Sequence, residues 1–147
     1  MRYSLAGLVV AVALFATAGT AQASDASLKA TVQAQETKFE QAADKYAKAA
    51  GHAKTNADLR KARSATKSFS KAVQTYHDKV AAETADTDKY KQGRKQLLDA
   101  LTTYKDGLDT LVKGIDDKST PKIKSALKKV VAAAKKYISA AKVFGLT

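Results

Sequence analysis

Large apolar residues recur every three or four positions through most of the chain, and this spacing constrains the fold more than any other feature. Such spacing places side chains on one face of an α-helix, whereas a half-buried strand would alternate at every second position. No segment alternates in that way, so the sequence predicts an all-α fold. Four segments carry the pattern: Leu28, Val32, Phe39, Ala42, Tyr46, Ala49 and Ala53; Leu59, Ala62, Phe69, Val73, Tyr76 and Val80; Tyr90, Leu97, Leu101, Tyr104, Leu108, Leu111 and Ile115; and Ile123, Leu127, Val130, Ala134, Tyr137, Ala141 and Phe144.

Local capping chemistry places the helix boundaries. Residues 55–58, Thr-Asn-Ala-Asp, have the form of a capping box and predict a helix that begins near Asn56. Residues 119–121, Ser-Thr-Pro, place a hydroxyl before the only proline, at the first helical position. Between them, the polar stretch 83–88 predicts a turn. Four helices of about 25 residues, each about 37 Å long and joined by short connections, should pack as an antiparallel up-down-up-down four-helix bundle.

The polar stretch leaves one alternative open. The apolar spacing runs in phase across residues 81–90, so the second and third helices could form one rod of about 90 Å, giving three helices with a fused long central helix. We favour the turn because Glu83, Thr87 and Arg94, which would lie on the seam of that rod, are polar. Residues 86–88 also suit the positive end of a helix dipole.

The N-terminus has the composition of a secretory signal peptide. Arg2 precedes an apolar run over residues 5–16, and small residues follow up to Ala23. This pattern predicts cleavage before Ser24 and a secreted or periplasmic protein, with residues 24–147 as a single helical domain. The apolar run is shorter than the about 20 residues that a membrane helix needs. An uncleaved anchor is the alternative.

The residue types exclude several catalytic and metal sites. The chain has no Cys, which excludes disulfides, thiolate metal sites and a cysteine nucleophile. His52 and His77 are predicted to lie about 30 Å apart and cannot share a metal ion. No phosphate-binding loop or nucleophile elbow is present, and Gly93, Gly107 and Gly114 are isolated glycines that should permit close helix approach or local bending. We therefore expect no cofactor, no metal and no enzymatic activity.

Charge is distributed unevenly along the chain. The 26 Lys and Arg against 14 Asp and Glu give a net charge of +12, and residues 118–147 hold eight lysines and no acidic residue. On a helical wheel, two lysine ridges border a wide apolar face that includes Leu127, Val131 and Ile138. The second helix adds a smaller basic stripe. The candidate polyanion-binding residues are Lys122, Lys124, Lys128, Lys129, Lys135, Lys136, Lys142, Arg60, Arg63, Lys67 and Lys71.

The sequence allows three interpretations of the protein's role, two of which concern this charge. The simplest is a solvated surface that keeps the protein soluble. The functional one is electrostatic binding to anionic envelope or extracellular polymers, lipid head groups or non-specific nucleic acid, because lysines contact phosphates as point charges. A third is a carrier of a small apolar ligand in the tyrosine-lined seam. Four acids near the end of the third helix should neutralise the nearer lysines and leave the far end of the last helix unscreened: Asp106, Asp109, Asp116 and Asp117.

Overall fold

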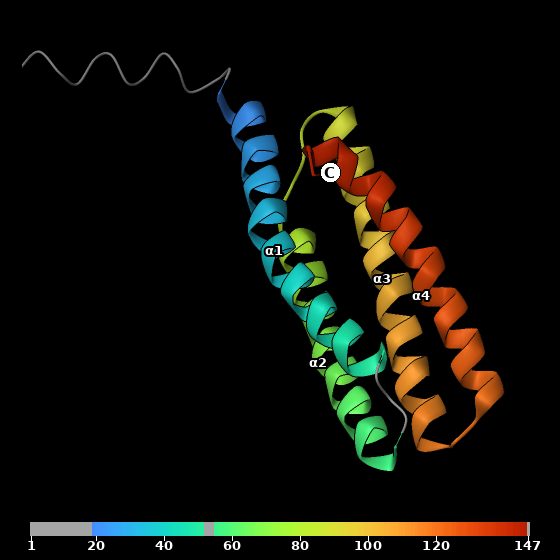
Figure 1. The fold of residues 1–147 in the computed structure, drawn as a ribbon. Helices are drawn as coiled ribbons and strands as arrows, with labels where there is room; N and C mark the ends of the chain where they lie inside the picture. Colours follow the sequence, from blue (N-terminus) through green and yellow to red (C-terminus); the bar gives the residue numbers. More distant parts are fainter. Residues whose placement is uncertain (1–18, 52–54, 147) are drawn as a thin grey trace, which may run out of the picture.

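The computed structural model describes residues 19–51 and 55–146, which form helices and short connections. The helices are α1 (Gly19–Gly51), α2 (Asn56–Ala82), α3 (Asp88–Asp116) and α4 (Thr120–Ala141), followed by the short 3-10 helix η1 (Lys142–Phe144). They alternate in direction and pack as an antiparallel up-down-up-down bundle (Figure 1). No strand occurs in these two ranges. The predicted all-α four-helix bundle is confirmed.

Both predicted caps form at the starts of α2 and α4. The Thr55 hydroxyl accepts a hydrogen bond from the Asp58 backbone N–H at 3.1 Å, and the Asp58 carboxylate accepts one from the Thr55 N–H at 3.0 Å. The Ser119 hydroxyl accepts from the Lys122 N–H at 3.5 Å, and Pro121 stands in the first turn of α4. Residues close together in the sequence therefore set these two boundaries.

The chain turns between α2 and α3, so the alternative of a fused central helix is wrong. The polar residues of this turn make specific contacts. Glu83 accepts hydrogen bonds from two hydroxyl groups of α1, at 2.9 Å from Ser27 Oγ and 2.6 Å from Thr31 Oγ1. Arg94 donates to two carbonyl oxygens at the end of α2, those of Val80 and Ala81, at 3.2 and 2.8 Å. These contacts satisfy groups that a helix end leaves free.

The turn just before α3 is bound by a residue of α1. Thr87, at the N-cap position, makes no capping bond with its own side chain. Instead, the Asp25 carboxylate accepts from the Asp86 backbone N–H at 2.8 Å and from the Thr87 hydroxyl at 2.6 Å. The hydrogen bond from Thr87 lowers the pKa of Asp25. These hydrogen bonds connect the N-terminal part of α1 to the turn between the two helical hairpins.

Aromatic rings fill the centre of the bundle. Phe39 of α1 stacks on Tyr137 of α4 with ring centroids 4.7 Å apart, and Phe69 of α2 lies 5.3 Å from Phe39 and 5.4 Å from Tyr104 of α3. The buried Tyr76 donates its hydroxyl to the Val32 carbonyl oxygen at 3.2 Å. The seam that the sequence assigned to tyrosines is therefore closed by ring-on-ring packing from all four helices.

Helices α3 and α4 approach each other through small residues. A Cβ built at Gly107 would lie 3.1 Å from the Val130 backbone nitrogen, and one at Gly114 would lie 3.0 Å from the Ile123 backbone nitrogen. Helix α4 also buries alanines at seven-residue intervals: Ala126, Ala133 and Ala140. The expectation that the glycines permit close approach is confirmed. Contacts between α3 and α4 are the most extensive in the bundle, whereas α1 and α4 pack little against each other.

Because α4 packs closely against α3 and only slightly against α1, the predicted core face of α4 is wrong in part. Leu127, Val131 and Ile138 were expected to pack, but their exposed fractions are 42%, 56% and 54%. Because α4 turns its alanine edge to α3, the other edge of its apolar face points toward α1, which does not pack closely enough to cover it. Leu59, expected in the seam of α2, is likewise 41% exposed at the first turn of that helix. Ala53 lies outside the described residues.

Candidate functional site

The lysines of α4 form the most strongly charged surface of the described protein. All seven predicted lysines of this helix and its C-cap are exposed. Within the described residues, Lys122 alone among them has a carboxylate within 4 Å, that of Asp117 at 2.6 Å. One ridge, Lys122, Lys129 and Lys136, runs beside α3, since the Cβ atoms of its first two members lie over Gly114 and Gly107. The other ridge, Lys124, Lys128, Lys135 and Lys142, borders the exposed aliphatic residues of α4.

The basic stripe of α2 does not join the lysines of α4. Arg63 forms a two-pronged ion pair with Asp116 of α3, in which Nη2 donates to Oδ2 at 2.8 Å. The guanidinium lowers the pKa of Asp116 through hydrogen bonding and charge. Arg60, Lys67 and Lys71 are exposed along the same helix. Since α3 packs between α2 and α4, its acidic end separates the two predicted parts of the site.

The predicted neutralisation of a nearby lysine by an acid of α3 is confirmed at Asp117, and two further acids pair with other bases. Asp116 pairs with Arg63, Asp117 pairs with Lys122, and Asp109 pairs with Lys105 of its own helix at 2.5 Å. Asp109 also accepts a hydrogen bond from the Ser70 hydroxyl at 2.6 Å. These contacts are confined to α3, α2 and the start of α4. The lysines from 124 to 142 therefore keep their charge uncompensated by any carboxylate within 4 Å in the described chain.

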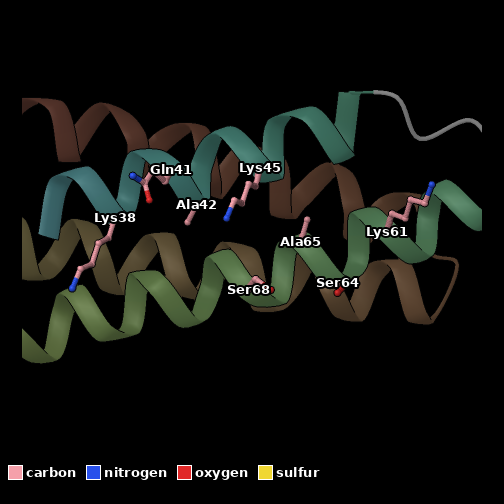
Figure 2. A pocket seen from close by; sticks show the side chains of 8 residues that line it. All are labelled: Lys38, Gln41, Ala42, Lys45, Lys61, Ser64, Ala65 and Ser68. Carbon is pink, nitrogen blue, oxygen red and sulfur yellow. The ribbon is translucent and has the colours of Figure 1, made fainter.

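A second basic surface, which the sequence reasoning missed, lies between α1 and α2. It is a hollow of about 450 Å³ lined by eight residues, shown in Figure 2: Lys38, Gln41, Ala42, Lys45, Lys61, Ser64, Ala65 and Ser68. Lys38 and Lys45 extend from α1 toward α2, and the small side chains of Ala42 and Ala65 leave the space between the helices open (Figure 2). Lysines, hydroxyls and an amide line this hollow, with no carboxylate among them.

The sequence contains a signal for this hollow. Lys38, Gln41 and Lys45 follow one another at intervals of three and four, as do Lys61, Ser64 and Ser68. Each set therefore lies on one helical face. Which faces of α1 and α2 meet depends on the packing of the hairpin, so the two sets become one surface only in the folded protein.

A smaller hollow of about 240 Å³ lies between α1 and α4. Glu36 and Glu40 of α1 line it together with four residues from the end of the chain: Tyr137, Ile138, Ala141 and Leu146. Burial, and then the neighbouring Glu40, raise the pKa of Glu36 to about 7. The Tyr76 hydroxyl donates a long hydrogen bond, 3.5 Å, to the Glu36 carboxylate. The carboxyl of Glu36 is thus more easily protonated than an exposed glutamate.

We expect Glu36→Gln to stabilise the fold at pH 8 and to have little effect at pH 4.5. The pKa of Glu36 is raised in the folded state, so protonation of Glu36 favours folding. This contribution to the free energy of unfolding is fully present below about pH 4.5, the pKa of the carboxyl in the unfolded chain, and is lost as the pH rises through about 7. At pH 8 the substitution should raise the free energy of unfolding by about 2 kcal/mol. This is less than the change in pKa would give for a fully buried group, because the carboxyl is partly hydrated. Urea unfolding of both proteins across this pH range measures it. An equal gain at both pH values would contradict the assignment.

No group of three or more His, Asp or Glu side chains in the described residues could hold a metal ion. His77 contacts Asp78 at 3.2 Å, and His52 lies outside the described residues. None of the helices, as far as they are described, is long and apolar enough to cross a bilayer.

Comparisons with known proteins found no relative on which a family assignment could rest. No protein-family model, curated protein or solved structure matches the chain.

Proposed function

We propose that the protein is an exported, non-catalytic polyanion-binding bundle and that α4 provides its binding surface. One observation carries the proposal: of seven exposed lysines on α4 and its C-cap, six have no carboxylate within 4 Å among the described residues. Folding usually brings opposite charges near one another at a surface. Here the charge remains available to a partner. Asp109 and Asp116 of α3 pair with bases outside α4, and Asp99, which lines a hollow with Lys135 and Lys136, forms no ion pair with either lysine in the described structure.

The chemistry of the surface favours phosphate-rich partners without sequence preference. Lysine ammonium groups act as point charges on flexible stems, whereas reading of base edges favours the planar fork of arginine. Suitable partners are anionic envelope polymers and lipid head groups, and nucleic acid would bind non-specifically. The export part of the proposal rests on the N-terminal pattern, with cleavage before Ser24. Ser24 and Asp25 contact the α2–α3 turn, so a chain cleaved at this point would keep both of these contacts.

Salt dependence tests the proposal. We expect the mature chain to bind duplex DNA and a poly(glycerol phosphate) polymer at low salt. If about six phosphates are contacted on DNA, the logarithm of the binding constant should fall with the logarithm of salt concentration at a slope near −5. Fluorescence anisotropy at several salt concentrations measures this slope. Failure to bind either polymer at low salt would mean that the lysines are only a solvated face.

The alternative, a carrier of a small apolar ligand, has less support. The tyrosine-lined seam is occupied by aromatic rings in mutual contact, with Phe39 central to four of the ring pairs. A ligand would have to separate these rings. A carrier would also bind independently of salt, because burial of apolar surface does not release counterions. The same titration therefore distinguishes the two functions.

A further inference from the structure

Three aliphatic side chains lie in one line on the exposed side of α4. We name Leu127, Val131 and Ile138 the aliphatic stripe. In the described residues, four large hydrophobic side chains are exposed, and three of them belong to this stripe. Intervals of four and seven residues keep them on one helical face over about 16 Å. Single exposed apolar residues are ordinary on a protein surface, but apolar residues gathered in one place indicate a contact site.

A lysine ridge runs along the aliphatic stripe. Lys124, Lys128, Lys135 and Lys142 are exposed and have no carboxylate within 4 Å in the described part of the chain. The helical repeat places this ridge directly beside the stripe and extends it over about 27 Å. The methylene stems of lysines can lie along apolar surface while the ammonium groups remain in a polar layer. The stripe and the ridge therefore form one amphipathic surface.

We propose that this surface binds the head-group layer of an anionic lipid bilayer, with α4 parallel to the membrane and the aliphatic stripe inserted to a shallow depth. The inference rests on the proposed polyanion binding and specifies its partner. A soluble polyanion would contact the lysines and leave the stripe in water. A bilayer can contact both the lysines and the aliphatic stripe. Its phosphates bind the ammonium groups, and the boundary of its acyl chains covers the aliphatic side chains. The limited packing of α1 against α4 leaves this side of α4 open.

A second copy of the chain fits the surface less well. On the α1 side of the stripe, the carboxylates that line the hollow next to Ile138 are Glu36 and Glu40. Two copies meeting through this surface would bring together two sets of four lysines and only two carboxylates from each chain. The negative charges of an anionic bilayer, in contrast, are numerous enough to balance the four lysines. Self-association is therefore the competing outcome that the experiment must distinguish.

A single tryptophan reports insertion directly. The chain contains no Trp, so Val131→Trp introduces a lone fluorophore in the stripe. We expect its emission to shift to the blue with vesicles of phosphatidylglycerol and phosphatidylcholine, but not with phosphatidylcholine alone or with DNA. Leu59→Trp is the matched control, because Leu59 is also exposed but lies on α2. An unshifted Val131→Trp reporter on bound vesicles would overturn the proposal.

A second variant separates this inference from the proposed function. The triple substitution Leu127→Ser, Val131→Ser and Ile138→Ser should weaken binding to phosphatidylglycerol vesicles about tenfold or more and leave DNA binding unchanged. Leu59→Ser should change neither. If the triple variant binds vesicles like the wild type, insertion fails while polyanion binding stands; if neither vesicles nor DNA bind the wild type, both proposals fail. A dimer that sedimentation detects in the wild type and not in the triple variant would assign the stripe to self-association instead.

Discussion

Replacing Lys128, Lys129, Lys135 and Lys136 by Gln should weaken binding to duplex DNA about 10³-fold at physiological salt. All four side chains are exposed, and none has a carboxylate within 4 Å among the residues described. Each phosphate contact that is lost removes the release of about one counterion, so the salt slope should fall from near −5 to about −2. Anisotropy titrations of the two proteins measure both quantities. Thermal unfolding should change little, because these side chains lie outside the packed face of α4.

A charge-matched control decides whether the location of the lysines matters. Lys48, Lys79, Lys89 and Lys95 are exposed on α1, α2 and α3. Replacing these four by Gln removes the same net charge without touching α4, and should lower DNA affinity much less than the α4 substitutions. Equal losses in the two variants would mean that binding follows net charge alone and that α4 is not the binding surface.

Gly107→Leu should destabilise the bundle by about 3 kcal/mol, which corresponds to a fall in melting temperature of about 10 °C. An added Cβ would lie 2.9 Å from Val130 Cγ2 and 3.1 Å from the Val130 backbone nitrogen. The side chain of valine can rotate, but its backbone can move only if α4 separates from α3. The helix propensity of leucine returns up to about 1 kcal/mol, which is less than the cost of separating the helices. Circular dichroism during thermal unfolding measures the loss.

The control for this glycine is Gly51→Leu. A Cβ at Gly51 would meet no atom of the described residues within 4 Å, so the melting temperature should remain near that of the wild type. Gly107→Ala should fall between the two leucine variants, because it gains propensity and adds one carbon to the tight contact. A Gly107→Leu protein as stable as the wild type would show that α3 and α4 do not pack through this seam.

The aromatic core shows why periodicity alone identified so much of the fold. A side chain at every third or fourth position must face the same way once the chain is helical, whatever it packs against. Phe39, Phe69 and Tyr137 were therefore recognisable as core residues, and all three are buried. The two local caps were recognisable for a related reason, since their donors and acceptors are within three residues of each other.

The candidate site was predictable only in part. The lysines of α4 were identified by the absence of acids over residues 118–147, which is a property of the sequence itself. Whether each lysine is paired depends on its neighbours in space, and the pair between Lys122 and Asp117 was specific to the fold of the α3–α4 turn. The hollow that contains Lys38 and Lys61 was missed because it combines residues from two helices.

The sequence by itself determined the four helical segments, the starts of α2 and α4 and the excess of charge on α4, because each of these depends on residues a few positions apart. The tertiary structure alone decided which edge of each helix is covered. Asp25 accepts a hydrogen bond from the backbone of Asp86, 61 residues further along the chain, and Leu127, Val131 and Ile138 are exposed although their spacing is that of core residues. The physical reason is that a wide apolar face can pack on either edge. The glycines of α3, against which Val130 and Ile123 of α4 lie, allowed close packing on one edge of α4 and left the other edge exposed.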